Sequence, residues 1–194
     1  MGVNEMSDEE YLAAYLARVQ EAIATVQAAD LKRLVDAIER TVAAGAHVFY
    51  IGNGGSAATA SHYVNDLVMA YMRTNRVVRV SSLTDNPALV TGIANDYSFE
   101  EVFEHQLRAL AQPGDLVVAI SASGNSPNLV RAIEYARSVG LTTAAVLGFD
   151  GGKLKGIADV VVHVHTELGD YGPAEDAHLV INHAVAGAIR ARGE

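Results

Sequence analysis

Imidazole and carboxylate side chains recur at helical spacing in two parts of this sequence. His62 and Asp66 are four residues apart and therefore share one face of a predicted helix. Glu175 and His183 belong to a second segment with a helical pattern, near the C-terminus. Such side chains from two helices could bind zinc through nitrogen and oxygen, or could move protons on a sugar as an acid–base pair. Spacing alone leaves both possibilities open, because a single histidine is more often a buried or capping residue than a ligand.

Three loops rich in glycine and small polar residues follow short apolar runs, at 52–56, 121–127 and 148–153. In open parallel sheets, ligands bind beyond the carboxyl ends of the strands, which is where these loops are expected. Glycine lets backbone amides approach an anion, and serine hydroxyls add donors for phosphate oxygens. Ser126 followed by Pro127 is typical of a helix N-cap and first helical residue. An ordinary capped turn would explain one such loop, but two together favour a phosphate cradle that needs no lysine or arginine.

The first of these loops also resembles the fingerprint of dinucleotide-binding sites, as Gly52-x-Gly54-x-x-Ala57. That fingerprint requires an acidic residue at the end of the second strand, where it holds the ribose. Here the second strand ends in Ser-Ser-Leu at 81–83, and Asp85 comes too late. The pattern therefore argues against a nicotinamide enzyme.

The composition predicts a single globular domain over residues 1–194. Half of the residues are hydrophobic and 19% are charged, which is ample for one core. With 23 acidic and 14 basic residues the net charge is −9, so we expect no nucleic-acid partner. There is no cysteine, so a metal would take nitrogen and oxygen ligands. The N-terminus does not resemble a secretory signal and no apolar run is long enough to span a membrane, so we expect a cytoplasmic protein with no membrane partner.

The hydrophobic pattern predicts an α/β fold. Residues 1–45 hold a pair of helices, the first beginning with a capping box formed by Ser7 and Glu10. Residues 46–194 alternate short apolar runs with helical stretches, which is typical of a parallel sheet with helices on both faces. The strands are expected at 48–52, 77–82, 116–121, 142–148 and 159–165, and the last helix from about 174 to 192. His163 and His165 share a face of the fifth strand; a metal pair is possible, but a half-exposed edge strand is the simpler interpretation.

Several motifs occur in the same order as in the sugar isomerase (SIS) domain family. They are GNGGSAATASH at 52–62, ANDYSFEEVF at 94–103, ISASGNSPN at 120–128, GFDGGKL at 148–154 and EDAHLVINH at 175–183. The chain resembles this family over nearly its whole length and, within it, the phosphoheptose isomerases. The resemblance implies a five-stranded parallel sheet and a homotetramer with active sites at the subunit interfaces. It also implies conversion of sedoheptulose 7-phosphate to D-glycero-D-manno-heptose 7-phosphate through an enediol, with one zinc ion bound per subunit.

The resemblance further assigns roles to individual residues of this chain. The phosphate and the sugar would be bound by a set of polar loop and helix residues: Asn53, Gly54, Ser56, Asn95, Asp96, Ser121, Ser123, Ser126 and Glu175. The zinc ligands would be His62, Asp66, Glu175 and His183, and the catalytic pair would be Asp66 and His183. Asp66 stands where the family has glutamate, which shortens the side chain by one methylene. Glu175 stands where the family has glutamine, which adds a negative charge to the site.

Three functions stay open at this point. The leading hypothesis is an aldose–ketose isomerase that acts on a seven-carbon sugar phosphate. The second is a non-catalytic SIS module that binds a sugar phosphate or a protein partner, like a bacterial relative that associates with the replication initiator. The third is an isomerase of another phosphosugar. An imidazole and carboxylate set retained at positions 62, 66 and 183 favours an enzyme.

Overall fold

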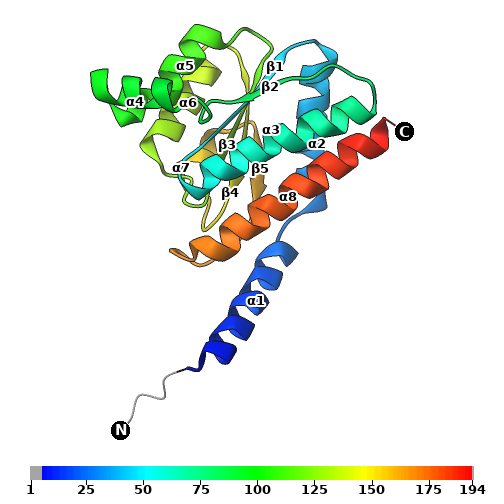
Figure 1. The fold of residues 1–194 in the computed structure, drawn as a ribbon, viewed down its shortest axis with the longest axis vertical. Coiled ribbons are helices and arrows are strands. Elements are labelled where there is room, and N and C mark those ends of the chain that lie inside the picture. Colours follow the sequence, from blue (N-terminus) through cyan, green and yellow to red (C-terminus); the bar gives the residue numbers. More distant parts are fainter. Residues whose placement is uncertain (1–5, 194) are drawn as a thin grey trace.

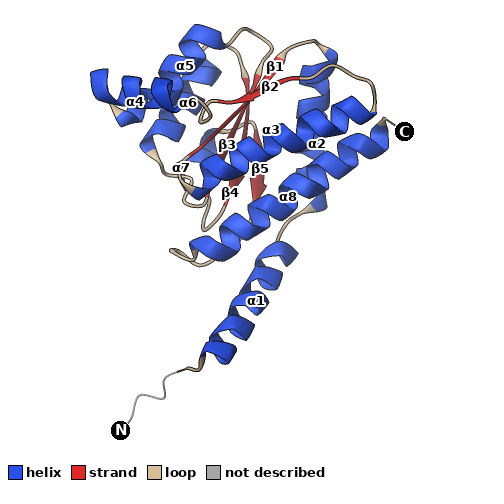
Figure 2. Ribbon diagram, viewed as in Figure 1, coloured by secondary structure: helices blue, strands red, loops and turns tan. Residues whose placement is uncertain are grey.

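The computed structural model describes residues 6–193, which form an α/β fold (Figure 1 and Figure 2). Five strands, all parallel, make one sheet in the order β2-β1-β3-β4-β5, with β5 at an edge. The predicted fold class, the five parallel strands and the two leading helices are confirmed. The elements are α1 (Asp8–Ala24), α2 (Ala28–Ala43), β1 (His47–Gly52), α3 (Gly55–Arg73), β2 (Arg79–Ser82), α4 (Pro87–Asp96), η1 (Phe99–Glu101), α5 (Val102–Leu110), β3 (Leu116–Ser121), α6 (Pro127–Ser138), β4 (Thr142–Leu147), α7 (Gly152–Ile157), β5 (Val160–His163) and α8 (Tyr171–Arg192).

Helices cover both faces of the sheet, because successive side chains of a strand point to opposite faces. In β1, Val48 and Tyr50 pack with α2, α3 and α8, whereas Phe49 and Ile51 pack with α4, α5, α6 and α7. All six residues of β3 are buried, as expected for a central strand of a parallel sheet. In the described part of the chain, no helix is both long enough and apolar enough to cross a membrane.

Three elements differ in extent from the prediction. Strand β2 begins at Arg79 and not at 77, because its pairing with β1 starts there, and Val77 is left 84% exposed. Strand β5 ends at His163, whose side chain is buried, while His165 lies beyond the strand and is exposed. Helix α8 begins at Tyr171, three residues earlier than expected, because a proline in the first turn of a helix breaks no intrahelical hydrogen bond.

Helix α1 projects away from the α/β core (Figure 1). The predicted capping box is present: Ser7 accepts from the amide of Glu10, and the Glu10 carboxylate accepts from the amide of Ser7. One side of α1 is tied to the beginning of α8, where Arg18 pairs with Asp170 at 3.1 Å and Tyr15 donates to Asp176. Helix α1 also exposes large apolar side chains to solvent: Tyr11, Leu12 and Leu16.

Helices α3 and α8 run side by side in the same direction across one face of the sheet (Figure 1). The hydroxyl of Tyr63 on α3 donates to the carbonyl of His178 on α8 at 3.0 Å. The His178 ring is 1% exposed, and neither of its nitrogens has a hydrogen-bond partner among the described residues. Burial lowers the pKa of this imidazole to about 4, and the nearby carbonyl of Leu147 offsets only part of the shift. His178 is therefore neutral in the folded chain.

Because burial disfavours protonation of the His178 ring, we expect the folded chain to lose stability in mild acid. The unfolded chain takes up a proton near pH 6.5, whereas the folded chain does so only near pH 4. The free energy of unfolding therefore falls as the pH drops through this window, by an amount on the order of 3 kcal/mol from this residue. In His178→Leu, the fall between pH 7 and pH 4 is smaller, as measured by urea unfolding followed by circular dichroism. His165→Leu, which changes an exposed histidine, is the control, and an equal fall in the wild type and in His178→Leu would contradict the assignment.

Candidate active site

The predicted phosphate loops meet at the carboxyl edge of the sheet, between the N-termini of α3 and α6. They enclose a cavity of about 130 Å³. This is roughly the volume of four water molecules, which suits a phosphate-sized group and not a whole sugar. The polar lining comprises Asn53, Ser56, Ser121, Ser123, Ser126, Tyr171 and Glu175. We call this cavity and its lining the cradle.

Hydrogen bonds between loops hold the cradle in shape. Asn53 and Asn128 exchange two amide hydrogen bonds at 2.9 Å, which join the loop after β1 to the start of α6. Ser121 Oγ accepts from the amide of Gly124 at 3.0 Å, and Asn125 Oδ1 accepts from the amide of Lys153 at 3.0 Å. The loops after β1, β3 and β4 are thus fixed relative to one another before any ligand binds.

Two glycines let the backbone adopt the conformations that these loops need. Gly54 precedes α3 with φ 52° and ψ −122°, which only glycine adopts readily. Gly124 has φ 62° and packs against the carbonyl oxygen of Gly151, which a Cβ would overlap. Because Gly124 has no side chain, the loop after β3 can pack directly against the backbone of the loop after β4.

The charges around the cradle are unusual for an anion site. No lysine or arginine lines it, so an anion would interact with hydroxyls, an amide side chain and the positive ends of two helices. Glu175 faces the beginning of α3, where its carboxylate packs against Gly55. Burial raises the pKa of this carboxyl, and the charge of Asp176 raises it further. Ionisation of Glu175 therefore costs more beside the cradle than it would in water.

A second constellation lies further along α3 and α8, where Asp66 stands between two imidazoles. Asp66 Oδ2 is 3.4 Å from His62 Nε2 and 3.6 Å from His183 Nε2. The two histidine rings meet edge to face, with centroids 5.3 Å apart. Asp66 is largely buried and both histidines are partly open to solvent. We call these three residues the triad.

The triad has the donor set of a zinc site and of an acid–base site. Its three ligand atoms all lie within 4.8 Å of one another. In tetrahedral zinc sites the ligand atoms are separated by about 3.3 Å, close to the separations found here. Two imidazoles and one carboxylate also suit proton transfer, because the carboxylate can accept a proton while an imidazole gives or takes one.

One residue that contacts the triad was not singled out by the sequence analysis. Asn182 is 2% exposed, and its Nδ2 donates to Asp66 Oδ2 at 2.8 Å. A second amide, from Asn65, donates to Asp66 Oδ1 at 3.0 Å. These bonds orient the carboxylate. Asn182 lies one turn from His178 and directly before His183, so helical spacing from these histidines was the available clue.

The structure separates residues that the sequence analysis had grouped. Glu175 lines the cradle and is not part of the group formed by His62, Asp66 and His183. It lies eight residues before His183 on the same helix, a rise of about 12 Å. Asn95 and Asp96 lie at the exposed end of α4 and are not among the residues that line the cradle. Within one chain, the predicted site is thus divided among three places.

The sequence and structure were compared with those of known proteins. Residues 10–148 match the SIS domain family. A phosphoheptose isomerase from Paramagnetospirillum magneticum is 36% identical over 184 residues, which cover 93% of this chain and 95% of the relative. The chain belongs to the phosphoheptose isomerase family of SIS-domain proteins. A probable phosphoheptose isomerase from Thermoplasma acidophilum is 39% identical over 80% of this chain and 85% of its own.

The fold of a solved family member agrees with this membership. The structure of a phosphoheptose isomerase from Neisseria gonorrhoeae superposes with a TM-score of 0.84 at 28% identity, covering 94% of this chain and 99% of that one. Members of the phosphoheptose isomerase family are aldose–ketose isomerases, so the chain is classed as an enzyme. The resemblance seen in the sequence motifs is thereby confirmed.

The close packing of Gly124 implies that one added methyl group would disturb the cradle. In Gly124→Ala the Cβ overlaps the Gly151 carbonyl and the backbone is strained, so we expect a loss of about 1 to 3 kcal/mol in the free energy of unfolding. Inorganic phosphate should also bind more weakly, as measured by calorimetry. Gly156→Ala is the matched control, because a Cβ there meets open space and alanine favours the helix. Unchanged stability and phosphate affinity in Gly124→Ala would contradict this account of the cradle.

Proposed function

We propose that this enzyme converts sedoheptulose 7-phosphate to D-glycero-D-manno-heptose 7-phosphate. The position of the Asp66 carboxylate between two imidazoles carries the proposal, together with the family to which the chain belongs. The cradle would bind the phosphate at one end of the sugar through serines 121, 123 and 126, with Asn53, Gly54 and Ser56 beside them. Asn95 and Asp96 would contact the sugar from the end of α4. Since a phosphosugar is a metabolite of the cell interior, we propose the cytoplasm as its compartment.

The reaction needs one base at carbon and one proton carrier at oxygen. Asp66 would remove a proton from C1 of the ketose, and the electrons of that bond would form the C1–C2 double bond of the enediol. His183 would deliver a proton to the C2 carbonyl oxygen and would take the proton of the C1 hydroxyl. Return of the proton from Asp66 to C2 then leaves an aldehyde at C1. Asn182 would keep the carboxylate aimed through its bond to Oδ2.

Zinc is the cofactor that this donor set suits best. His62, Asp66 and His183 would hold the ion, and Glu175 would complete the set from a neighbouring copy of the chain. The metal would polarise the carbonyl and its neighbouring oxygen as a Lewis acid. The separations of the triad atoms, and the absence of thiol ligands in the sequence, support zinc bound through nitrogen and oxygen.

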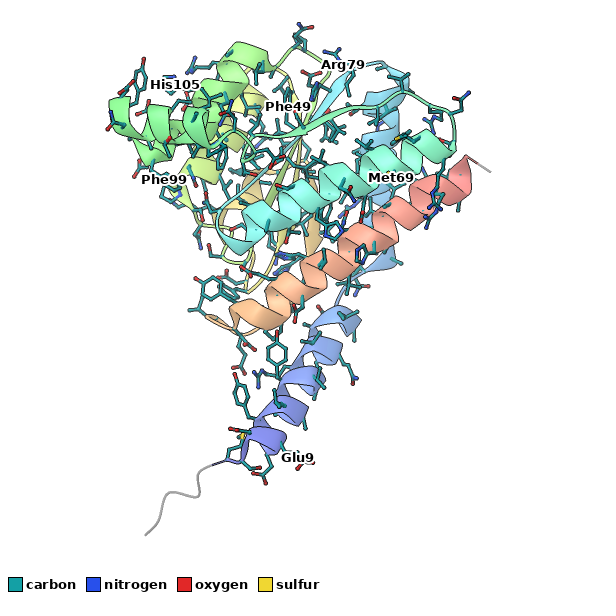
Figure 3. The ribbon with its side chains drawn as sticks, viewed as in Figure 1. Glu9, Phe49, Met69, Arg79, Phe99 and His105 are labelled. Carbon is teal, nitrogen blue, oxygen red and sulfur yellow. The ribbon has the colours of Figure 1, made fainter. Side chains whose placement is uncertain are left out.

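The distances within one chain support a homotetramer with its active sites between subunits. Ser56 in the cradle and Asp66 in the triad are ten residues apart on α3, a rise of about 15 Å. This exceeds the reach of one seven-carbon sugar between its phosphate and its carbonyl. One sugar could contact both sites if the cradle came from one copy of the chain and the triad from another. Exposed apolar side chains on α1 and beside α4 offer surfaces for such contacts. Beside α4 they are Tyr97 and Phe99, of which Phe99 is labelled in Figure 3.

Turnover of the proposed substrate is the direct test. The parent protein should form the aldoheptose phosphate from sedoheptulose 7-phosphate, followed by NMR with and without added zinc. Asp66→Asn and His183→Ala should each lower kcat by about 10²- to 10⁴-fold, because each removes one acid–base group. His165→Ala, at an exposed position outside the triad, is the control. No turnover by the parent under either condition would contradict the proposal, and phosphosugar binding without turnover would favour the non-catalytic alternative.

Subunit mixing tests whether the site is shared. A cradle variant, Ser121→Ala with Ser123→Ala, and a triad variant, Asp66→Asn, should each be nearly inactive alone. Co-refolded tetramers should regain about a quarter of the parent activity, because one site in four then pairs an intact cradle with an intact triad. Asp66→Asn mixed with His183→Ala should regain none, because both changes fall in one triad. Light scattering should give a mass of about 82 kDa, four chains of 20.5 kDa; a monomer, or no recovery in the first mixture, would contradict a shared site.

A further inference from the structure

Four arginines have no acidic partner among residues 6–193, and two of them, Arg73 and Arg190, line one hollow; the other two are Arg40 and Arg79. Seven other arginines pair with carboxylates, as expected in a chain with 23 acidic and 14 basic residues. Arg73 and Arg190 form no ion pair with any carboxylate among residues 6–193. Both are exposed, and both line the same hollow of about 410 Å³. Nothing in the proposed reaction uses either of them.

The hollow continues directly from the triad. Asp66 and His183 form one end of it, and Arg73 and Arg190 form the other. Each arginine lies seven residues after its triad residue, on α3 and on α8 respectively, so each lies two turns further along the same helix face. Helices α3 and α8 run in the same direction (Figure 1), so the two spacings match and both arginines line one hollow.

Small residues form the floor between these two ends. Ala70, Ala186 and Gly187 lie there, and Met69 stands beside them on α3 where this helix runs along α8 (Figure 3). A Cβ added at Gly187 would lie 3.9 Å from Arg190 Nη2, so the guanidinium folds back over the floor toward the triad. This direction is the usual one for helical side chains, which lean toward the N-terminus of their helix. The floor thus leaves room for a ligand within reach of the arginines.

Two guanidinium groups around one hollow match the chemistry of a phosphate dianion. Arginine binds phosphate oxygens in pairs, and its charge persists at every physiological pH. The arginines start about 10 Å beyond the triad along the helices and lean back toward it. A phosphate on the carbon next to the reacting carbonyl would therefore fall between the triad and the guanidinium groups.

We propose that this hollow is a second phosphate subsite, which binds a phosphate carried at C1 of a sugar already held by its other phosphate in the cradle. The proposal rests on the proposed function, because that function places the reacting end of the sugar at the triad. Its ligands are sugar bisphosphates phosphorylated at both ends, and inorganic phosphate is the free source of the same chemistry. Such a bisphosphate occupies the active site without being converted and therefore inhibits the enzyme. Arg73 and Arg190 thereby determine which phosphosugars bind.

Two ligands that differ by one phosphate test the subsite. Sedoheptulose 7-phosphate and sedoheptulose 1,7-bisphosphate are titrated by calorimetry into the full-length wild-type protein, into the double variant Arg73→Gln/Arg190→Gln, and into Arg40→Gln. Arg40 is an exposed arginine on α2 and controls for the loss of a positive charge. In the wild type and in Arg40→Gln, the bisphosphate should bind at least about tenfold more tightly than the monophosphate. In the double variant this preference should vanish, while the monophosphate affinity changes by less than about twofold.

A second arm uses inorganic phosphate on the cradle variant Ser121→Ala/Ser123→Ala. Phosphate binding that persists there and disappears when the two arginine changes are added identifies free phosphate as a ligand of the hollow. Binding of the bisphosphate alone identifies the sugar-borne phosphate as the ligand. Equal affinities for the two sugars in the wild type, a preference retained in the double variant, or an equal loss in Arg40→Gln would each overturn the proposal. Failure of the proposed function is distinct, because sedoheptulose 7-phosphate would then not be converted.

Discussion

The parallel packing of α3 against α8 is the constraint on which the rest of the structure depends. The contact of Tyr63 with the backbone of His178 fixes one helix against the other, and the helices keep this register along their length. Their N-terminal ends meet at the cradle, their middle turns bring Asp66 to His183, and their last turns carry the two arginines. A shift of either helix by one residue would rotate a side chain by about 100° and would separate the triad. The His178 ring, which is buried and has no hydrogen-bond partner among residues 6–193, lies at this contact between the two helices.

The cradle offers an anion neutral donors and the positive ends of two helices. The loops of the cradle are joined by hydrogen bonds, and no lysine or arginine among residues 6–193 lines it. Preorganised donors that are shielded from water interact with charge more strongly than exposed ones do. Glu175 places a carboxyl group beside these donors, and its raised pKa shows that burial disfavours the charged form. The position of this carboxylate is explained if Glu175 contributes to the active site of a neighbouring copy of the chain. There it would bind a cation or a sugar hydroxyl.

Sequence reasoning predicted what depends on local pattern and could not predict what depends on packing between elements. The capping box at Ser7 and the five strands follow from short-range periodicity and were predicted. The pairing of His62 with Asp66 follows from their spacing within one helix. That Asp66 also meets His183 depends on the register of two helices 117 positions apart in the chain, which only the resemblance to a family supplied. Helical spacing also places Glu175 two turns before His183, so the two cannot belong to one ligand set within a chain. The exposed position of Asn95 depends on the direction in which α4 projects, which local pattern does not determine.

The distribution of charge also explains how a substrate with one phosphate would be oriented. Both the cradle and the hollow attract anions, so a monophosphate could in principle enter either way round. The arginines of the hollow are exposed, so water and salt screen their charges more than those of buried groups. The donors of the cradle are partly buried and are held in place by hydrogen bonds between the loops, so a hydrogen bond to each of them is worth more. A single phosphate would therefore bind in the cradle first, and only a ligand with a second phosphate would gain from the hollow.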